Sequence, residues 1–142
     1  MKIKIKKLHE NAKIPNYQTD GSVGFDFSSV QDLVIRSGES ALVSTGLSIE
    51  LPKGYELQVR PRSGLALKHS ITVLNSPGTV DSDYRGELKV ILINHGKNDF
   101  YIAVGERIAQ GVINKVELVQ FDEVDELSET ARGISGFGST GI

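Results

Sequence analysis

The sequence of 142 residues contains no cysteine, no large excess of charge of either sign and no long apolar run. The missing cysteines exclude disulfides, thiolate metal sites and catalysis by a thiol. Sixteen basic residues against eighteen acidic ones create no overall field that would attract nucleic acid or a membrane, so any anion site must be local. The N-terminal segment has no apolar stretch that would suit a signal peptide or a membrane span. We therefore expect a soluble, cytoplasmic protein with no nucleic-acid partner and no membrane partner.

Short apolar segments with a period of two dominate the sequence, and Gly, Pro, Asn and Asp separate them. This pattern predicts an all-β protein, and the length suits a single domain with one core. About seven to ten strands in a chain of this length imply a sandwich, jelly roll or barrel. The expected strands are Lys2–Leu8, Asp32–Ile35, Ser40–Leu51, Tyr55–Arg60, Gly86–Asn94, Phe100–Val104 and Arg107–Phe121.

One short helix is predicted over Ser63–His69, with Ser63 as its N-cap. Arg62 lies directly before it. The start of a helix offers free N–H groups and partial positive charge, so Arg62 and Ser63 suit a phosphate group. An ordinary N-cap explains the same residues, and both interpretations stay open at this point.

Two charged stretches have a structural explanation. The lysines within Lys2–Leu8 alternate with apolar residues, which favours the exposed face of a strand over a polybasic patch. The segment Glu117–Glu129 carries six acids and no base, and their irregular spacing favours a solvated connector over a metal site. No two of the three histidines lie within metal-ligand spacing of each other.

The segment Arg132–Gly141 contains four glycines together with hydroxyl side chains, one arginine and one phenylalanine. Glycine lets backbone N–H groups turn inward, and Arg132 adds a forked cation, so the segment suits a polyanion with Phe137 as an aromatic lid. Gly136–Gly141 fits G-x-G-x-x-G, but that fingerprint needs a strand before it and a helix after it, and a P-loop needs a lysine. A disordered Gly/Ser tail is the alternative. The Arg and Phe favour a mobile arm that becomes ordered on a nucleotide.

The segment Asn75–Gly86 is a polar turn region that lies within a predicted hairpin. Asn75 and backbone groups could pair with the edge of a base, and Tyr84 could pack on a sugar. Asp81 belongs to a D-x-D sequence, which occurs in plain turns but also suits a carboxylate that orients water or holds a metal.

The segment Gly105–Gly111 contains Arg107 and, three positions later, Gln110. Residues three apart in a regular strand point to opposite faces, so these two side chains need not share a partner.

These segments, in this order, resemble the five motifs of the trimeric deoxyuridine triphosphatase (dUTPase) family, and the likeness covers nearly the whole chain. No single motif would be specific, but five in order are. Gly24–Phe27 is similar to the first motif, Pro61–Ala66 to the second, Asn75–Gly86 to the third, Gly105–Gln110 to the fourth and Arg132–Gly141 to the fifth.

The resemblance implies a jelly-roll or β-clip-like barrel over residues 1–127 and a flexible, Gly-rich C-terminal arm over residues 128–142 that closes over the active site. It implies a homotrimer with active sites at subunit interfaces that hydrolyses dUTP to dUMP and pyrophosphate, by attack of water on the α-phosphate. This reaction limits uracil incorporation into DNA and supplies dUMP for thymidylate synthesis. Mg²⁺ would be held by the triphosphate and by water, with no direct protein ligand and with Asp26 reaching it through water.

The resemblance also implies roles for individual residues. Asp81 would activate the water, and Tyr84 would lie under the deoxyribose. Asp26 would lie near the metal and the phosphates, and Arg107 would support Asp81 or the fold. The implied substrate-binding residues are Arg62, Ser63, Gly64 and Gln110 for the phosphates, Asn75 and Gly78 for uracil, and Arg132, Phe137, Gly138, Ser139 and Thr140 from the arm.

Two other functions fit part of these motifs. A dCTP deaminase shares the fold and much of the phosphate site, but deamination needs a general base at the pyrimidine amino position, and the Asn75–Gly86 segment has no spare Glu for it. A non-catalytic nucleotide-binding regulator of the same fold would need neither Asp81 nor a complete arm. The three hypotheses predict release of pyrophosphate, release of ammonia and no product.

Overall fold

The structure is a computed structural model that describes residues 1–141. Within this range the chain forms ten β-strands and one short α-helix, which confirms the predicted all-β class. Ile142, the last residue of the predicted arm, lies outside the described residues. The elements are β1 (Lys4–Lys7), β2 (Phe25–Ser28), β3 (Leu33–Ile35), β4 (Ser40–Glu50), β5 (Tyr55–Arg60), α1 (Ser63–His69), β6 (Ile71–Val73), β7 (Gly78–Val80), β8 (Leu88–Asn94), β9 (Phe100–Ile102) and β10 (Arg107–Lys115).

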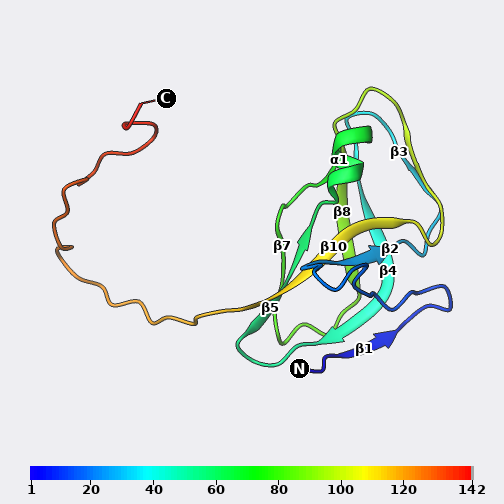
Figure 1. Ribbon diagram of the computed structural model, residues 1–142, viewed down its shortest axis with the longest axis horizontal. Coiled ribbons are helices and arrows are strands. Elements are labelled where there is room, and N and C mark those ends of the chain that lie inside the picture. The colour runs from blue at the N-terminus through cyan, green and yellow to red at the C-terminus, as the bar shows by residue number, and fades with distance from the viewer. Residues whose placement is uncertain (142) are drawn as a thin grey trace.

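Two antiparallel four-stranded sheets and one two-stranded sheet make up the body (Figure 1). The first sheet has the strand order β1-β4-β8-β6, the second has the order β2-β10-β5-β7, and β3 pairs with β9. The second sheet positions much of the candidate site. Gln110 of β10 lies opposite Asp26 of β2 on one side and opposite Arg60 of β5 on the other.

The inward-facing side chains of the sheets form one core. Leu88, Val90 and Leu92 alternate along β8 and are buried, whereas Lys89 between them is exposed. Burial of one large aliphatic side chain contributes about 1.5–3 kcal/mol, so slipping a strand by one residue would be very costly. The apolar alternation therefore decides which face of each strand presents polar residues to solvent.

The helix has the predicted bounds, but Ser63 is not its N-cap. Arg62 occupies the cap position with an extended backbone (φ −94°, ψ 129°), and no side chain caps the helix. Ser63 is instead the first helical residue and is exposed. Of the two open interpretations, the ordinary N-cap is therefore wrong.

The strand predictions hold for most of the chain and fail in identifiable places. Strands β2 and β7 were not predicted, β6 was expected only as the first arm of the hairpin around Asn75–Gly86, and β10 ends at Lys115 rather than at Phe121. Its pairing with β5 also ends there, with Lys115 opposite Tyr55. The predicted hairpin is present in part: β6 and β8 pair antiparallel, but the chain between them crosses to the second sheet and forms β7 there.

Two irregularities interrupt the ladders next to the candidate site. The pairing of β10 with β2 shifts register between Arg107 and Ala109, and the pairing of β4 with β8 shifts between Ser44 and Leu47. A β-bulge re-aims the side chains beside it and increases the local twist. Both irregularities therefore affect where polar side chains point.

After β10 the chain leaves the body and runs far out into solvent (Figure 1). Between residues 117 and 141 every residue except Gly136 is exposed. The backbone hydrogen bonds recorded within residues 130–141 each join residues three apart, such as Gly133 N–H to the carbonyl of Thr130. Within residues 1–141, no helix is long and apolar enough to cross a membrane.

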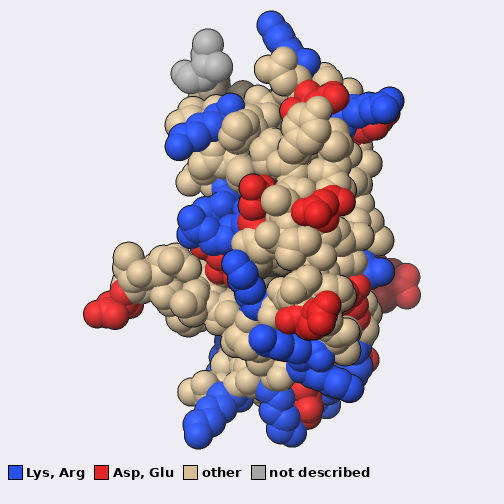
Figure 2. Space-filling model, turned by 90° about the vertical axis from the view of Figure 1, so that its right-hand side faces the viewer, with Lys and Arg blue, Asp and Glu red and all other residues tan. Residues whose placement is uncertain are grey.

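Charged groups of both signs are interspersed over the face shown in Figure 2, and basic groups gather at the lower end, where β1 lies in Figure 1. The lysines of β1 are exposed while Ile5 between them is half-buried, as expected for the outer face of a strand.

Candidate active site

A carboxylate held between two arginines forms the centre of the candidate site. Asp26 of β2 lies with Oδ1 3.2 Å from Nε of Arg62 and with Oδ2 3.0 Å from Nη1 of Arg107. The Nη1 of Arg62 also donates to the backbone carbonyl of Arg107 at 3.1 Å. Three segments that are distant in sequence, similar to the first, second and fourth motifs, therefore meet at one point.

The β-bulge in β10 explains how Arg107 reaches this point. In a regular strand Arg107 and Gln110 would lie on opposite faces. The register shift at Ile108 moves the alternation by one residue, so that both Ile108 and Ala109 are buried. Arg107 then contacts Asp26, and Gln110 donates from Nε2 to the carbonyl of Pro61 at 2.9 Å. The two side chains have different partners, as the sequence allowed, yet both belong to this cluster. The resemblance implied that Arg107 supports Asp81 or the fold, and the carboxylate that Arg107 contacts here is that of Asp26.

The cluster keeps an excess of positive charge. Two guanidinium groups share one carboxylate, and the side chains of Asp26, Arg62 and Arg107 are 15%, 23% and 48% exposed. Partial burial strengthens the attraction between such charges relative to bulk water. A phosphate that approaches the exposed sides of the arginines thus meets cations already held in place.

Gly24 makes room for the glutamine of this cluster. A Cβ at position 24 would lie 2.1 Å from Oε1 of Gln110, a contact that real Cβ atoms essentially never make. Ser63 and Gly64, in the first turn of α1, are exposed, and a Cβ at Gly64 would meet nothing within 4 Å. The sequence placed Gly24 in a motif but did not predict it as a site residue, because only the fold reveals the close approach.

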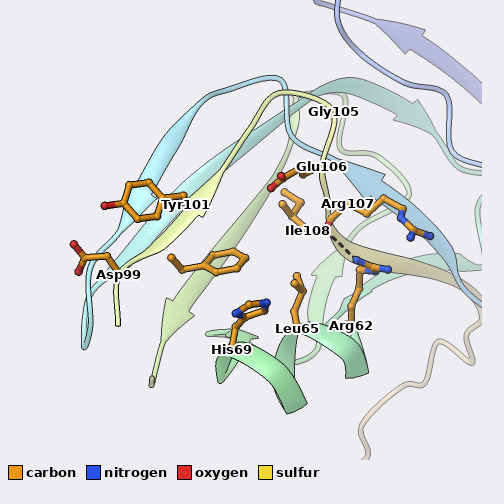
Figure 3. Close-up of a pocket in the computed structure, with 10 residues that line it drawn as sticks. Arg62, Leu65, His69, Asp99, Tyr101, Gly105, Glu106, Arg107 and Ile108 are labelled. Carbon is orange, nitrogen blue, oxygen red and sulfur yellow. Dashed lines mark hydrogen bonds between the residues drawn. The ribbon is translucent and has the colours of Figure 1, made fainter. Parts of the chain in front are cut away.

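A hollow of about 600 Å³ lies beside the arginines, between α1 and the segment from β9 to β10 (Figure 3). Apart from Arg62 and Arg107, the residues that line this hollow were not predicted as site residues from the sequence. The rings of His69 and Phe100 lie 5.1 Å apart here. The lining residues are Arg62, Leu65, His69, Asp99, Phe100, Tyr101, Gly105, Glu106, Arg107 and Ile108.

The residues of the third motif lie on a different part of the surface. Gly78 is buried on β7, opposite Val59, whereas Asn75, Asp81 and Tyr84 are exposed. Asp81 and Tyr84 line a hollow of about 330 Å³, and Asp81 also lines a neighbouring one; neither hollow includes an arginine of the cluster. The turn itself is closed by a hydrogen bond from Tyr84 N–H to the carbonyl of Asp81 at 3.2 Å.

The predicted arm residues lie apart from both sites. Arg132 donates from Nε to the carbonyl of Ser135 at 2.8 Å, and Ser139 N–H donates to the carbonyl of Gly136 at 3.1 Å. The side chain of Phe137 is fully exposed, and its backbone has a positive φ of 51°. Gly138 (φ 85°) lies beside it, and Thr140 is exposed. A single chain therefore assembles the arginine cluster. It does not bring the third motif or the arm to that cluster.

Fold and cluster together define a jelly-roll-like all-β protein whose site suits a phosphorylated ligand. The model of the dUTPase family matches residues 10–141, and the chain belongs to this family. The family predicted from the five motifs is thereby confirmed.

Close relatives agree with this assignment. A deoxyuridine 5'-triphosphate nucleotidohydrolase of Wolinella succinogenes is 62% identical over 141 residues, which cover 99% of this chain and 95% of that protein. One from Helicobacter pylori is 58% identical over 142 residues, covering 100% of this chain and 98% of that protein. Among solved structures, the dUTPase of Staphylococcus bacteriophage 80alpha with dUPNHPP superimposes with a TM-score of 0.93 at 27% identity and covers 99% of both chains. These names favour hydrolysis over the deaminase alternative.

Proposed function

We propose that the protein hydrolyses dUTP to dUMP and pyrophosphate, and so limits uracil incorporation into DNA and supplies dUMP for thymidylate synthesis. The observation that carries this proposal is the preformed cluster in which Asp26 holds Arg62 and Arg107 beside Gln110. Phosphoryl chemistry depends mainly on positioning and on cations that stabilise charge on oxygens. Such a cluster supplies both before the substrate arrives.

The phosphates and the attacking water are assigned to different residues. Arg62, with Ser63 and Gly64 in the open first turn of α1, binds phosphate oxygens, together with Gln110. Asp81 orients the water that attacks the α-phosphorus and accepts its proton. A carboxylate near phosphates would repel them, so in the assembled site a role as a base would best account for Asp81.

The nucleoside is assigned to the third motif. Asn75 and the backbone at Gly78 pair with the edge of uracil, and the ring of Tyr84 lies against the deoxyribose. Gly78 is buried on β7, where its backbone pairs with β5 so closely that a Cβ there would lie 3.3 Å from Cβ of Val59. From the arm, Phe137 covers the base, and Arg132, Gly138, Ser139 and Thr140 bind the phosphates.

Mg²⁺ bound with the triphosphate would neutralise charge on the phosphate oxygens. The residues present fit an ion that is held by the triphosphate and by water. Both carboxylate oxygens of Asp26 already face a guanidinium group, so Asp26 suits a contact through water better than direct ligation.

A homotrimer with sites shared between subunits follows from the same proposal. The third motif and the arginine cluster line separate hollows within one chain, which supports a site completed by a second subunit. The connector also exposes apolar side chains that a neighbouring subunit would bury, including Leu118 at 73%, Phe121 at 95% and Leu127 at 87%. Light scattering should give about three times the chain mass of 15.4 kDa, and a monomer with full activity would contradict the shared site. A cytoplasmic location is part of this proposal.

Product analysis tests the proposed reaction directly. The protein is incubated with each deoxynucleoside triphosphate and Mg²⁺, and the products are separated and identified. We expect dUMP and pyrophosphate from dUTP. Ammonia released from dCTP would instead indicate the deaminase, and no product from any nucleotide would indicate a binding protein.

A further inference from the structure

The ring of Tyr84 lies directly over the α-carbon of Gly86. A Cβ built on Gly86 would lie 2.3 Å from the hydroxyl oxygen of Tyr84, 2.5 Å from its Cζ and 2.9 Å from its Cε2. Real Cβ atoms essentially never come within 3.0 Å of another heavy atom. The ring therefore occupies space that only a glycine at position 86 leaves free.

A hydrogen bond fixes the far end of the ring. The hydroxyl of Tyr84 donates to the backbone carbonyl of Glu87 at 2.9 Å, while the side chain stays 45% exposed to solvent. Nearly half of the side-chain surface is thus accessible to a ligand, while its hydroxyl end is held by the backbone at Glu87 and packs over Gly86.

That backbone is itself anchored to β4. Ser48 donates from Oγ to the carbonyl of Arg85 at 2.6 Å, and Thr45 donates from Oγ1 to the carbonyl of Leu88 at 2.6 Å. Both hydroxyl groups belong to buried residues. The ring position is therefore linked through Gly86 to the rigid first sheet.

The carboxylate of Glu87 adds a second anchor at the irregular part of β4. It accepts the N–H of Gly46 at 3.2 Å on Oε1 and the hydroxyl of Ser44 at 3.3 Å on Oε2. These groups lie where the pairing of β4 with β8 shifts register. The irregular ladder thus leaves the N–H of Gly46 available for a side chain, whereas a regular ladder would use such a group between strands.

We propose that Gly86 is a positioning residue for sugar specificity: its missing side chain is what lets the Tyr84 ring lie where it excludes a ribose 2′-hydroxyl. The inference rests on the proposed function, in which Tyr84 lies against the deoxyribose. A ring held against the sugar in this way rejects extra atoms by overpacking, because its hydrogen bond to Glu87 and the backbone beneath it keep it in place.

Replacing Gly86 by alanine tests this cleanly. The backbone of Gly86 does not have a positive φ, so alanine fits it without backbone strain. The atoms that must move are the end of the Tyr84 side chain rather than backbone or core. Gly86→Ala should therefore leave the fold intact and displace the ring.

The measured quantity is the ratio of kcat/KM for dUTP to kcat/KM for UTP. In Gly86→Ala this ratio should fall about 10-fold or more, the size of a steric discrimination that is lost. Gly21→Ala is the matched control, because a Cβ there meets nothing within 4 Å and the backbone has no positive φ, so its ratio should not change. An unchanged ratio in Gly86→Ala would overturn the inference.

A double-mutant cycle distinguishes this inference from the proposed role of Tyr84. Tyr84→Ala alone should lower the ratio, and adding Gly86→Ala to it should have no further effect, because the ring through which Gly86 acts is gone. Additive effects would show that Gly86 acts independently, and would overturn the inference while leaving the role of Tyr84 intact. If Tyr84→Ala leaves the ratio unchanged, the role of Tyr84 fails and the inference fails with it.

A second variant covers the case in which Gly86→Ala does not fold. Ser48→Ala removes the hydrogen bond to the carbonyl of Arg85, and Ser37→Ala removes an equally short one, 2.6 Å to the carbonyl of Gly96, outside the site. Ser48→Ala should lower the ratio about threefold, as expected for one lost hydrogen bond, and Ser37→Ala should not. Equal behaviour of the two serine variants would contradict the proposed anchoring of the ring.

Discussion

The cluster around Asp26 and the arm over Arg132–Gly141 offer the same kinds of group to a ligand but hold them differently. In the cluster, Arg62 and Arg107 each lie within 3.2 Å of a carboxylate oxygen that projects from a core strand. In the arm, the hydrogen bond recorded for the Arg132 side chain within residues 1–141 goes to a carbonyl three residues away, and every residue from 131 to 135 is exposed. The cluster is organised before a ligand binds, whereas the arm has no such support.

This difference indicates that the cluster and the arm act at different steps, the cluster in binding the nucleotide and the arm in closing over it. Ordering a free segment costs about 1–2 kcal/mol per residue fixed, so we expect the arm to close only when a ligand provides many contacts at once. In the proposed function the triphosphate would offer these contacts to Arg132 and to the hydroxyl groups, and closure would exclude bulk water and align the α-phosphate. The cluster should therefore determine whether a nucleotide binds, and the arm whether it reacts.

Removal of the arm should have the largest effect. A chain that ends at Thr130 should lose about 10³-fold in turnover, the low end of what an arginine that stabilises transferring phosphate contributes. Its affinity for dUMP and its Tm should be little changed, because the body keeps the cluster and the core. Steady-state kinetics, a dUMP titration and thermal unfolding measure the three quantities.

Limited proteolysis checks the same difference in the full chain. Trypsin should cut after Arg132 quickly in the free protein and slowly with a non-hydrolysable dUTP analogue and Mg²⁺. Equal rates in both states, or full activity of the shortened chain, would show that the arm is only a tail.

Asp81→Asn should have the next largest effect. Asp81 belongs neither to the cluster nor to the arm, so its loss should leave nucleotide binding intact and lower turnover at least about 10²-fold, as for a lost general base. Asp83→Asn is the matched control, because Asp83 is an exposed carboxylate two residues later in the same turn. Near-normal turnover of Asp81→Asn, or an equal loss in Asp83→Asn, would remove Asp81 from the mechanism.

Two glycine substitutions compare the stability of the two regions. A Cβ at Gly111 of β10 would lie 2.6 Å from Cε2 of Phe25 and 2.8 Å from Cε2 of Phe27, so Gly111→Ala overpacks the core. The free energy of unfolding should fall by about 1–3 kcal/mol. At Gly136 of the arm a Cβ would meet nothing within 4 Å, so Gly136→Ala should leave the free energy of unfolding unchanged. Denaturant unfolding measures both, and destabilisation by Gly136→Ala would mean that the arm packs on the body without ligand.

Phe137→Ala should have the smallest effect. Because the ring is fully exposed in the free protein, its removal should not change Tm. Stacking on a base is worth about 1–3 kcal/mol, so KM for dUTP should rise about 10-fold. Ile134→Ala, equally exposed in the same arm, should leave KM unchanged and serves as the control. An unchanged KM in Phe137→Ala would rule out its role as a lid on uracil.

Parts of the fold that depend on local pattern were predicted well. The helix over Ser63–His69 and the strand β5 have the predicted bounds, because alternation and helix propensity are properties of neighbouring residues. The alternation after Lys115 misled the strand prediction, since a strand needs a partner and the pairing of β10 with β5 ends at that residue. The short strand β7 was missed because its residues look like a turn and become a strand only by pairing with β5.

The sequence by itself determined the all-β class, the family and most candidate site residues, because these follow from residue types in a local order. The tertiary structure alone decided how the residues meet. Arg107 contacts Asp26, which lies 81 positions away in the sequence, because of a β-bulge that the alternating pattern does not predict. Gly24 looks like an ordinary turn glycine until folding brings the side chain of Gln110 against it. Close approach between distant segments depends on the packing of the whole core, and no local pattern encodes it.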